Sequence, residues 1–120
     1  REQVSELSAL LVREGVDAVI ATNTTVARDA VAALRHGNET GGLSGAPLRE
    51  ASTRVIGWLK DALQGALPII GAGGILSGAD AQEKIAAGAT LVQFYTGMVY
   101  RGPELVSECV KALAVPAVAK

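Results

Sequence analysis

The sequence predicts an α/β fold in which short parallel strands alternate with helices. Three short runs, at 16–21, 67–70 and 90–94, are rich in apolar and β-branched residues. Amphipathic helix patterns lie before, between and after these runs, and such alternation is typical of right-handed βα units. The helix pattern ahead of each strand is followed by a glycine, at Gly15, Gly65 and Gly88. Glycine commonly ends helices because it adopts the left-handed conformation at little cost.

The opening helix and the strands are predicted from the spacing of apolar residues. The helix is indicated by apolar residues three and four positions apart, namely Val4, Leu7, Leu10 and Leu11. The runs VDAVIA (16–21) and TLVQF (90–94) are mostly apolar rather than alternating. Strands of this kind occur in parallel sheets that are covered on both faces, so we expect both faces to be covered here.

The second helix carries a regular apolar stripe. Its members are Val55, Ile56, Leu59 and Leu63. Trp58 lies in the same helix, and we interpret it as a packing residue or a helix–helix contact rather than a stacking surface for a ligand.

The last two helices are predicted from their first turns and their apolar residues. Ser77 is expected to cap one helix, with Asp80 three residues on as a shortened capping box. The other follows Pro103, a favoured first-turn residue, and lines up Leu105, Val106, Cys109, Val110 and Leu113. The lone cysteine is therefore expected to be a buried hydrophobic residue rather than a reactive thiol, and no intramolecular disulfide can form.

The composition excludes several classes of protein. The chain has 120 residues, of which 49% are hydrophobic and 19% charged, which argues for one folded domain and against disorder. A net charge of -1 argues against nucleic acid as a partner. No apolar run approaches the ~20 residues of a membrane span, and the first residues do not resemble a signal peptide. We expect this segment itself to be soluble.

The connection between the first strand and the second helix is unusually long. It spans about 25 residues, whereas 2 to 6 are usual for such loops, and it contains ETGGLSG at 39–45. Long βα loops at the carboxyl ends of parallel strands commonly carry binding sites, so we expect a site here rather than a plain insertion.

The position of the glycine-rich segment distinguishes two parallel α/β folds. A dinucleotide-binding sheet carries G-x-G-x-x-G after its first strand. In this chain GAGG (71–74) follows a late strand and has a different spacing. We therefore predict part of a TIM (β/α)8 barrel, in which phosphate sites commonly form after strands seven and eight.

Two consecutive strands end in segments that suit a phosphate group. They are GAGG (71–74) and QFYTG (93–97). The backbone N–H groups of Gly73, Gly74, Tyr95 and Thr96 are predicted to converge on an oxyanion near a helix amino end, where negative charge is favoured. The glycines would then remove the Cβ atoms that keep a phosphate from the main chain. A glycine-lined turn without a ligand is the alternative.

The stretch ATNTT (21–25) ends the first strand with polar side chains. Asn supplies donors and an acceptor for a ligand that bears carbonyl, N–H and carboxylate groups. Asn and Thr also shape turns, so the pattern alone is a weak signal. The only histidine, His36, lies in a polar loop and is expected to be solvated surface.

Four motifs in order resemble the dihydroorotate dehydrogenase family, most closely its quinone-dependent class 2. They are ATNTT (21–25), ETGGLSGAPL (39–48), LPIIGAGG (67–74) and EKIAAGATLVQFYTG (83–97), the last followed by RGP (101–103). The resemblance covers nearly the whole chain but only the carboxyl-terminal part of the family's barrel, about its last three βα units. We therefore expect residues 1–120 to be a single partial domain, a piece of a longer protein.

The resemblance implies an enzyme that uses FMN to oxidise dihydroorotate to orotate in pyrimidine biosynthesis, with a quinone as electron acceptor. It implies that Thr22 and Gly45 contact FMN, and that Gly74 with Tyr95 and Thr96 holds its phosphate. It further implies that Asn23 and Thr24 bind the substrate. The family's catalytic serine and its flavin-contacting lysine have no match in the chain. We therefore assign no catalytic residue and no metal ligand, and expect the segment alone to be inactive.

The partners and the location implied by the resemblance lie mostly outside the chain. The quinone and the membrane are expected to meet an amino-terminal helical extension of the complete enzyme. That enzyme would be peripheral on the inner membrane of a bacterium or a mitochondrion. Open barrel edges are expected to favour self-association of the segment.

Two other interpretations stay open on the sequence alone. Another FMN or sugar-phosphate TIM barrel would explain the phosphate signature, but not ATNTT and ETGGLSG. A non-catalytic structural or interaction fragment would be expected to show its unpaired strand edges and no flavin binding. Flavin absorbance and FMN binding by the complete protein discriminate between these interpretations.

Overall fold

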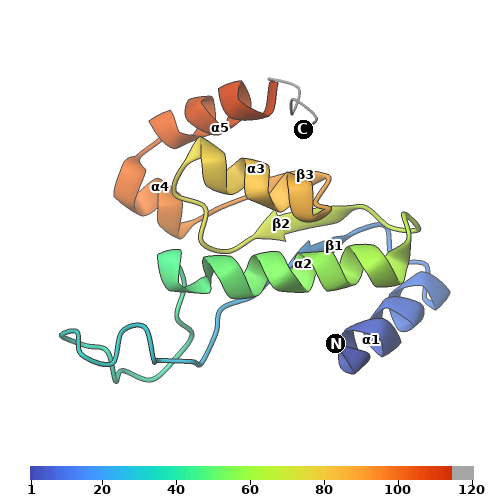
Figure 1. Cartoon of the computed structure of the whole chain (residues 1–120), viewed down its shortest axis with the longest axis horizontal. Coiled ribbons are helices and arrows are strands. Elements are labelled where there is room, and N and C mark those ends of the chain that lie inside the picture. The colour runs from blue at the N-terminus through green and yellow to red at the C-terminus, as the bar shows by residue number, and fades with distance from the viewer. Residues whose placement is uncertain (115–120) are drawn as a thin grey trace.

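Helices and strands alternate in the computed structural model, which describes residues 1–114 (Figure 1). The elements are α1 (Glu2–Arg13), β1 (Val19–Ala21), the 3-10 turn η1 (Ala46–Leu48), α2 (Arg49–Leu63), β2 (Ile69–Ala72), α3 (Gly78–Ala87), β3 (Leu91–Gln93), α4 (Thr96–Arg101) and α5 (Glu104–Ala114). The helix predicted after Pro103 is confirmed as α5, whereas the short helix α4 that precedes it was not predicted. Gly102, with φ of 71°, ends α4, and Pro103 follows it.

The three strands form a parallel sheet in the order β1-β2-β3. Val19 pairs with Ile69, and Ile70 pairs with both Ile20 and Leu91. Because the strands are parallel and adjacent, their carboxyl ends lie along one edge of the sheet, as Figure 1 shows. The segments that follow β1, β2 and β3 therefore emerge side by side, which is the condition for a shared site.

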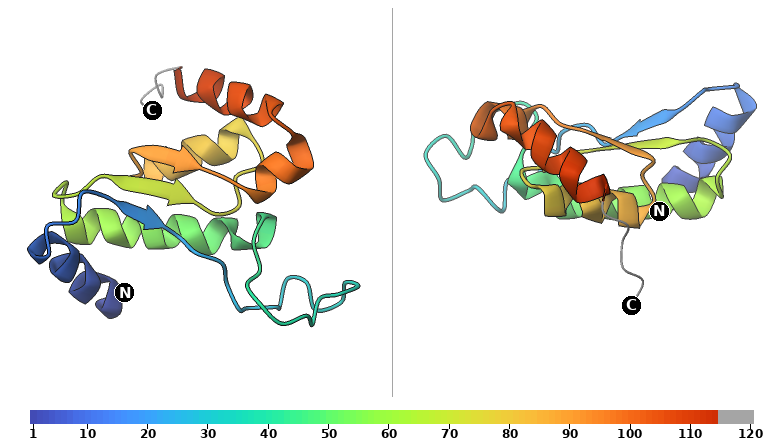
Figure 2. Two further views of the ribbon diagram at one scale, coloured as in Figure 1. Left: turned by 180° about the vertical axis from the view of Figure 1, so that it is seen from behind. Right: turned by 90° about the horizontal axis from the view of Figure 1, so that it is seen from above.

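A layer of helices covers one face of this sheet (Figure 2). The main core lies between α2 and the sheet and contains Ala21, Ile56, Leu59, Leu63, Ile69 and Ala89. A second core joins α3 to α5 and contains Ile75, Ala81, Leu105 and Cys109. The predicted stripe of the second helix and the predicted burial of the cysteine are thus confirmed.

The prediction that both faces of the strands are covered is wrong for the described residues. Ile20 is 56% exposed and Leu91 is 60% exposed. Both are aligned with Ile70 in the register, on the face that points away from the helices. In a closed barrel this inner face is filled by side chains of the other strands, so strand composition reports a burial that three strands cannot provide alone.

The apolar stripes predicted for the first and last helices, α1 and α5, are only partly buried. In α1, Leu7 is 47% and Leu10 41% exposed, whereas Ser8 is buried and its hydroxyl donates to the carbonyl of Val4. In α5, Val110 is 62% exposed. No helix among residues 1–114 combines the length and apolar character needed to cross a membrane.

The start of α3 agrees with the predicted cap, whereas α2 ends one residue earlier than predicted. Ser77 caps α3 by accepting a hydrogen bond from the N–H of Asp80, as predicted. The end of α2 is a correction, because Gln64 takes the left-handed conformation (φ 47°) one residue before Gly65. Trp58 is half-buried and lines a hollow with Ser5 of α1 and with Arg1, which precedes α1, in agreement with a helix–helix contact.

Candidate functional site

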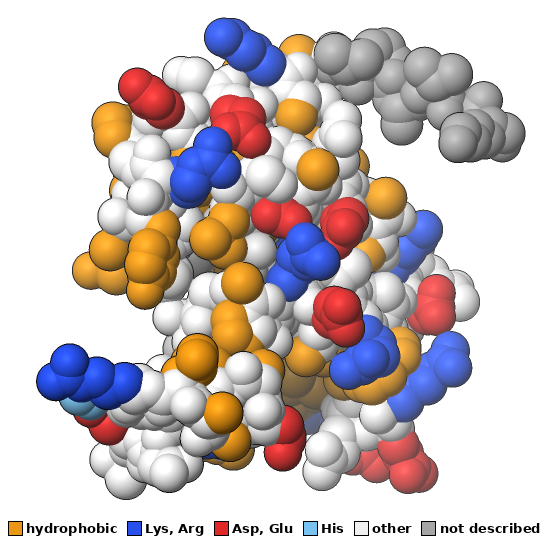
Figure 3. All heavy atoms as spheres, turned by 60° about the vertical axis from the view of Figure 1, so that its left-hand side comes forward, with side chains coloured by type: hydrophobic (Ala, Val, Ile, Leu, Met, Phe, Trp, Pro, Cys, Tyr) orange, Lys and Arg blue, Asp and Glu red, His pale blue; other side chains and the backbone are white. Residues whose placement is uncertain are grey.

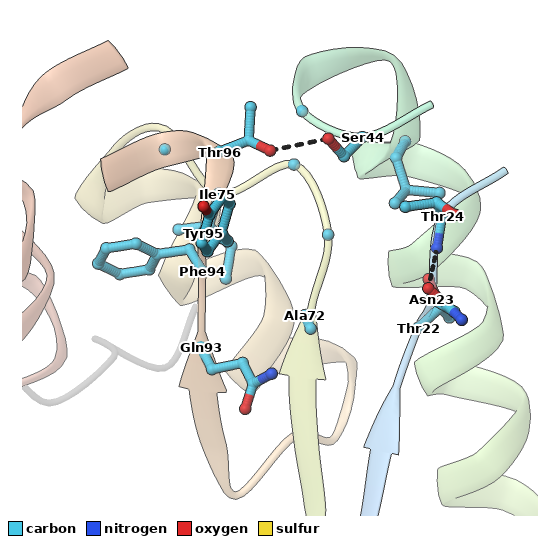
Figure 4. A pocket seen from close by; sticks show the side chains of 15 residues that line it. Thr22, Asn23, Thr24, Ser44, Ala72, Ile75, Gln93, Phe94, Tyr95 and Thr96 are labelled. Atoms are coloured by element: carbon cyan, nitrogen blue, oxygen red, sulfur yellow. Dashed lines mark hydrogen bonds between the residues drawn. The ribbon is translucent and has the colours of Figure 1, made fainter. Parts of the chain in front are cut away.

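A cleft of about 450 Å³ opens at the carboxyl edge of the sheet (Figure 4). Its wall comes from the segments that follow the three strands and from the end of the long loop. The lining residues are Thr22, Asn23, Thr24, Ser44, Gly45, Leu48, Ala72, Gly73, Gly74, Ile75, Gln93, Phe94, Tyr95, Thr96 and Gly97. All eight residues predicted from the sequence to bind cofactor or substrate are among them. The volume lies in the range of small-molecule sites.

The polar groups after β1 are held in fixed directions. The N–H of Thr24 donates to Oδ1 of Asn23 over 2.8 Å, which leaves the Asn23 amide nitrogen free to donate (Figure 4). The N–H of Thr22 donates to the carbonyl of Ala72 over 3.0 Å. The hydroxyl of Thr22 is buried and has no hydrogen-bond partner among residues 1–114. A buried hydroxyl without a partner costs about 1–3 kcal/mol, so this atom is suited to meet a ligand.

The long loop leaves the body of the protein and returns to the cleft. Figure 3 shows it as an arm separated from the rest by a hollow. Thr25 and Leu43 form an antiparallel bridge at its base, with N–H to carbonyl distances of 3.0 and 2.7 Å. The guanidinium of Arg28 donates to the carbonyls of Thr25 and Glu39, and so closes the arm. The long loop therefore has internal hydrogen bonds that hold its two ends together, and it returns to the cleft, which a plain insertion need not do.

Two glycines let the returning loop lie against the other walls of the cleft. A Cβ on Gly42 would overlap the side chain of Thr24, and one on Gly45 would lie 3.1 Å from Cγ2 of Thr96. Between them, the hydroxyl of Ser44 is 2.8 Å from the hydroxyl of Thr96 (Figure 4). This contact joins the long loop to the start of α4.

Sequence reasoning missed several residues that line the cleft. Ser44 lies inside the motif ETGGLSG but was not singled out, and the side chain of Gln93 reaches from the end of β3 toward the end of β2 (Figure 4). A polar residue in the otherwise apolar run TLVQF is the signal that points to Gln93. Phe94 gave no signal, because strands commonly carry aromatic residues.

The glycines after β2 pack closely on the first turns of α2. Gly74 has φ of 76°, and a Cβ there would lie 2.5 Å from Cα of Arg49. At Gly73 (φ 109°) a Cβ would lie 3.0 Å from the side chain of Ser52. The turn therefore requires these glycines whether or not a ligand binds, which gives them a second reason beside the predicted phosphate.

The backbone of this turn and of the start of α4 offers hydrogen-bond donors to the cleft. Within residues 1–114, no carbonyl or side chain accepts a hydrogen bond from the N–H of Gly73, Gly74, Tyr95 or Thr96. Because Gly74 is buried, an unpaired N–H there is unfavourable unless a ligand accepts from it. Successive free N–H groups of this kind commonly bind anions.

A charged cluster lies behind the same turn. The carboxylate of Asp80 accepts from the N–H of Leu76 (3.0 Å) and from Arg49 (2.6 Å). Burial alone would raise the pKa of Asp80, but the hydrogen bonds from Leu76, Arg49 and Ser77 outweigh it and the pKa is lowered. Lys84 is fully buried beside this cluster, and burial lowers its pKa to about 8.

The side chains that line the cleft are mostly neutral. Of the described residues in its wall, Tyr95 alone carries a titratable group. The imidazole of His36 is 62% exposed on the loop and lies 2.6 Å from the carboxylate of Glu39, as expected for solvated surface. Burial raises the pKa of Cys109, so its thiol stays protonated at neutral pH.

Comparison with known proteins gives the same family that the sequence motifs resemble. The profile of the family described as dihydroorotate dehydrogenase matches residues 2–115. A "Dihydroorotate dehydrogenase (quinone)" from Thiobacillus denitrificans is 69% identical over 112 residues, which cover 93% of this chain and 33% of the relative. One from Leptothrix cholodnii is 64% identical over 111 residues, or 92% of this chain and 32% of the relative.

Solved structures agree with this similarity. The crystal structure of DHODH in complex with ferulenol from Eimeria tenella matches with a TM-score of 0.86 and 38% sequence identity, covering 93% of this chain and 30% of that one. The ligand-free type from the same organism gives 0.87. The prediction of part of a TIM barrel is confirmed. The chain spans about a third of the length of the curated relatives that it matches.

Proposed function

We propose, since the chain belongs to the dihydroorotate dehydrogenase family, that it forms the FMN-phosphate site and part of the orotate site of an enzyme that oxidises dihydroorotate with a quinone. The observation that carries this proposal is that residues of four segments, ATNTT, ETGGLSG, GAGG and QFYTG, line one cleft. The family match over 2–115 argues against an unrelated sugar-phosphate barrel. The activity belongs to the complete enzyme, of which residues 1–120 would be one partial domain.

The residues present fit the phosphate of FMN. The free N–H groups of Gly73, Gly74, Tyr95 and Thr96 would donate to its oxygens, and none of the described residues in the cleft wall carries a carboxylate that would repel the phosphate. The partnerless hydroxyl of Thr22 would gain a hydrogen bond from the same cofactor, beside Gly45 on the facing loop. Each of these groups is costly or idle without a ligand, which supports an occupant that brings acceptors.

The residues after β1 fit a substrate that bears oxygens. Because Oδ1 of Asn23 already accepts from Thr24, its amide nitrogen is directed to donate to a carbonyl or a carboxylate. Thr24 follows in the cleft wall, and its side chain packs on the backbone of Gly42, where a Cβ would leave no room for it. The chemistry that FMN supplies when bound is acceptance of a hydride from dihydroorotate and transfer of the electrons to quinone. The chain contributes binding and orientation, and the proton-abstracting group would come from another part of the barrel.

The contact with quinone and membrane is proposed to lie in another part of the complete enzyme. In the described residues no helix could span a bilayer. Further strands would close the barrel by pairing with the free edges of β1 and β3, and their side chains would cover the exposed inner row of Ile20 and Leu91. The isolated chain is therefore expected to associate through these edges and to turn over no dihydroorotate.

A chimera tests the proposal. This chain would replace the corresponding third of the Thiobacillus denitrificans relative, to which it is 69% identical. We expect the purified chimera to carry FMN, identified by absorbance and by release on denaturation, and to form orotate from dihydroorotate with a soluble quinone. A folded chimera that binds no FMN would contradict the proposal.

A matched pair of variants tests the substrate residues. Asn23→Ala should retain FMN but lose kcat/KM for dihydroorotate by about 10- to 100-fold, since a hydrogen-bond donor to the substrate is removed. Asn38→Ala, on the exposed part of the loop, should leave kcat/KM unchanged. Equal kinetics in both variants would show that Asn23 does not bind the substrate.

A further inference from the structure

Lys84 is a buried cation that neither the family match nor the cleft itself explains. Its side chain has no exposed surface, and all three protons of its ammonium are used. They are donated to the carbonyl of Arg49 (2.9 Å), to Oγ of Ser52 (3.2 Å) and to Oγ1 of Thr53 (2.7 Å). The first two turns of α2 are thereby fixed to α3.

The contacts of Lys84 continue to the two strand ends that carry the site. The hydroxyl of Ser52 donates to the carbonyl of Ala72, the last residue of β2. The same carbonyl accepts from the N–H of Thr22, the first residue after β1. A continuous set of hydrogen bonds therefore links the ammonium of Lys84 to both sides of the cleft.

The position of this cation is unfavourable unless an anion lies nearby. The amino end of a helix carries a partial positive charge, so a second positive charge there is destabilising. The carboxylates that act on Lys84, Asp80 and Glu83, are both ion-paired with Arg49, and none within residues 1–114 forms a salt bridge with Lys84. A Cβ on Gly73 would lie 3.0 Å from Oγ of Ser52, the same atom that accepts a hydrogen bond from the ammonium of Lys84, so the Ser52 hydroxyl connects the ammonium with the turn that lines the cleft.

We propose that Lys84 is a positioning residue for the phosphate of FMN: it fixes the turn at 71–74 through Ser52 and places a buried positive charge directly behind it. This inference rests on the proposed function. Burial lowers the pKa of Lys84 to about 8, although the charges of Glu83 and Asp80 act in the opposite direction. At neutral pH the ammonium is still protonated.

The test compares FMN with riboflavin, which lacks the phosphate, in the flavin-free chimera. Lys84→Met keeps an unbranched side chain, one atom shorter, and removes the charge, and Lys111→Met makes the same change on the exposed surface of α5. We expect Lys84→Met to weaken FMN binding at least about tenfold and riboflavin binding less than about twofold. Lys111→Met should change neither.

The outcomes separate the two proposals. If the unaltered chimera binds FMN no more tightly than riboflavin, the phosphate site itself is wrong. If it discriminates and Lys84→Met discriminates equally well, only the role of Lys84 is wrong. An equal loss for both flavins would show a general structural role and would also overturn the inference.

A second measurement needs no variant and covers the case in which Lys84→Met does not fold. The charged groups that face Lys84 are Arg49 from α2 and Asp80 and Glu83 from α3, and none of these residue types titrates between pH 7 and 9. Raising the pH through this range should weaken FMN binding several-fold while riboflavin binding stays constant. A constant ratio of the two affinities would contradict the proposal.

Discussion

The substitution Gly74→Ala separates the two reasons for the glycines after β2. A residue with a Cβ at φ of 76° costs about 1–2 kcal/mol in backbone strain. The new Cβ would lie 2.5 Å from Cα of Arg49, whereas ordinary contacts begin at 3.4 Å. Forcing that backbone apart adds about 1–3 kcal/mol, the usual cost of overpacking. We therefore expect the free energy of unfolding to fall by about 2–5 kcal/mol.

The assay is urea unfolding of the flavin-free chimera, with Gly15→Ala as the control. Gly15 has φ of 69°, and a Cβ there would meet nothing within 4 Å. The control therefore reports strain alone, about 1–2 kcal/mol. If Gly74→Ala costs no more than Gly15→Ala without flavin, the packing explanation is wrong, and close approach of a ligand would be the only reason for Gly74.

Three further predictions concern single side chains. Thr22→Val should raise the stability of the flavin-free chimera by about 1 kcal/mol, because a partnerless buried hydroxyl is removed, yet weaken FMN binding; a loss of stability on urea unfolding would show that the hydroxyl has a partner. Asp80→Asn should cost about 1.5–3 kcal/mol at pH 7. Since the pKa of Asp80 is lowered in the folded state, its stabilisation is present above the ordinary carboxyl range and is lost as the pH falls through the folded value. The difference between wild type and variant in acid titration should therefore shrink below about pH 4, and a difference independent of pH would refute it. Arg28→Met should release the loop arm and accelerate its proteolysis, with Arg35→Met as an exposed control; equal cleavage of both would show that Arg28 does not close the arm.

The sequence by itself determined the alternation of strands and helices, apart from α4, and the four segments that meet at the cleft. Alternation of apolar runs with glycine stops is enough to predict parallel βα units, since few connections between them are possible. Parallel strands then bring their carboxyl ends together, so ATNTT, ETGGLSG, GAGG and QFYTG had to converge. Local chemistry, such as the Ser77 cap, was equally readable because its partner, the N–H of Asp80, is three residues away.

Tertiary structure alone decided which face is bare and what lies behind the site. Ile20 and Leu91 look like core residues in the sequence. In the described residues, however, helices cover only one face of the three-stranded sheet, and these two side chains lie exposed on the other face. Lys84 lies among ordinary helix residues in the sequence, and its burial depends on Ser52 and Thr53, about thirty residues away. Contacts between distant segments leave no periodic pattern, because each depends on how two elements pack rather than on spacing within one.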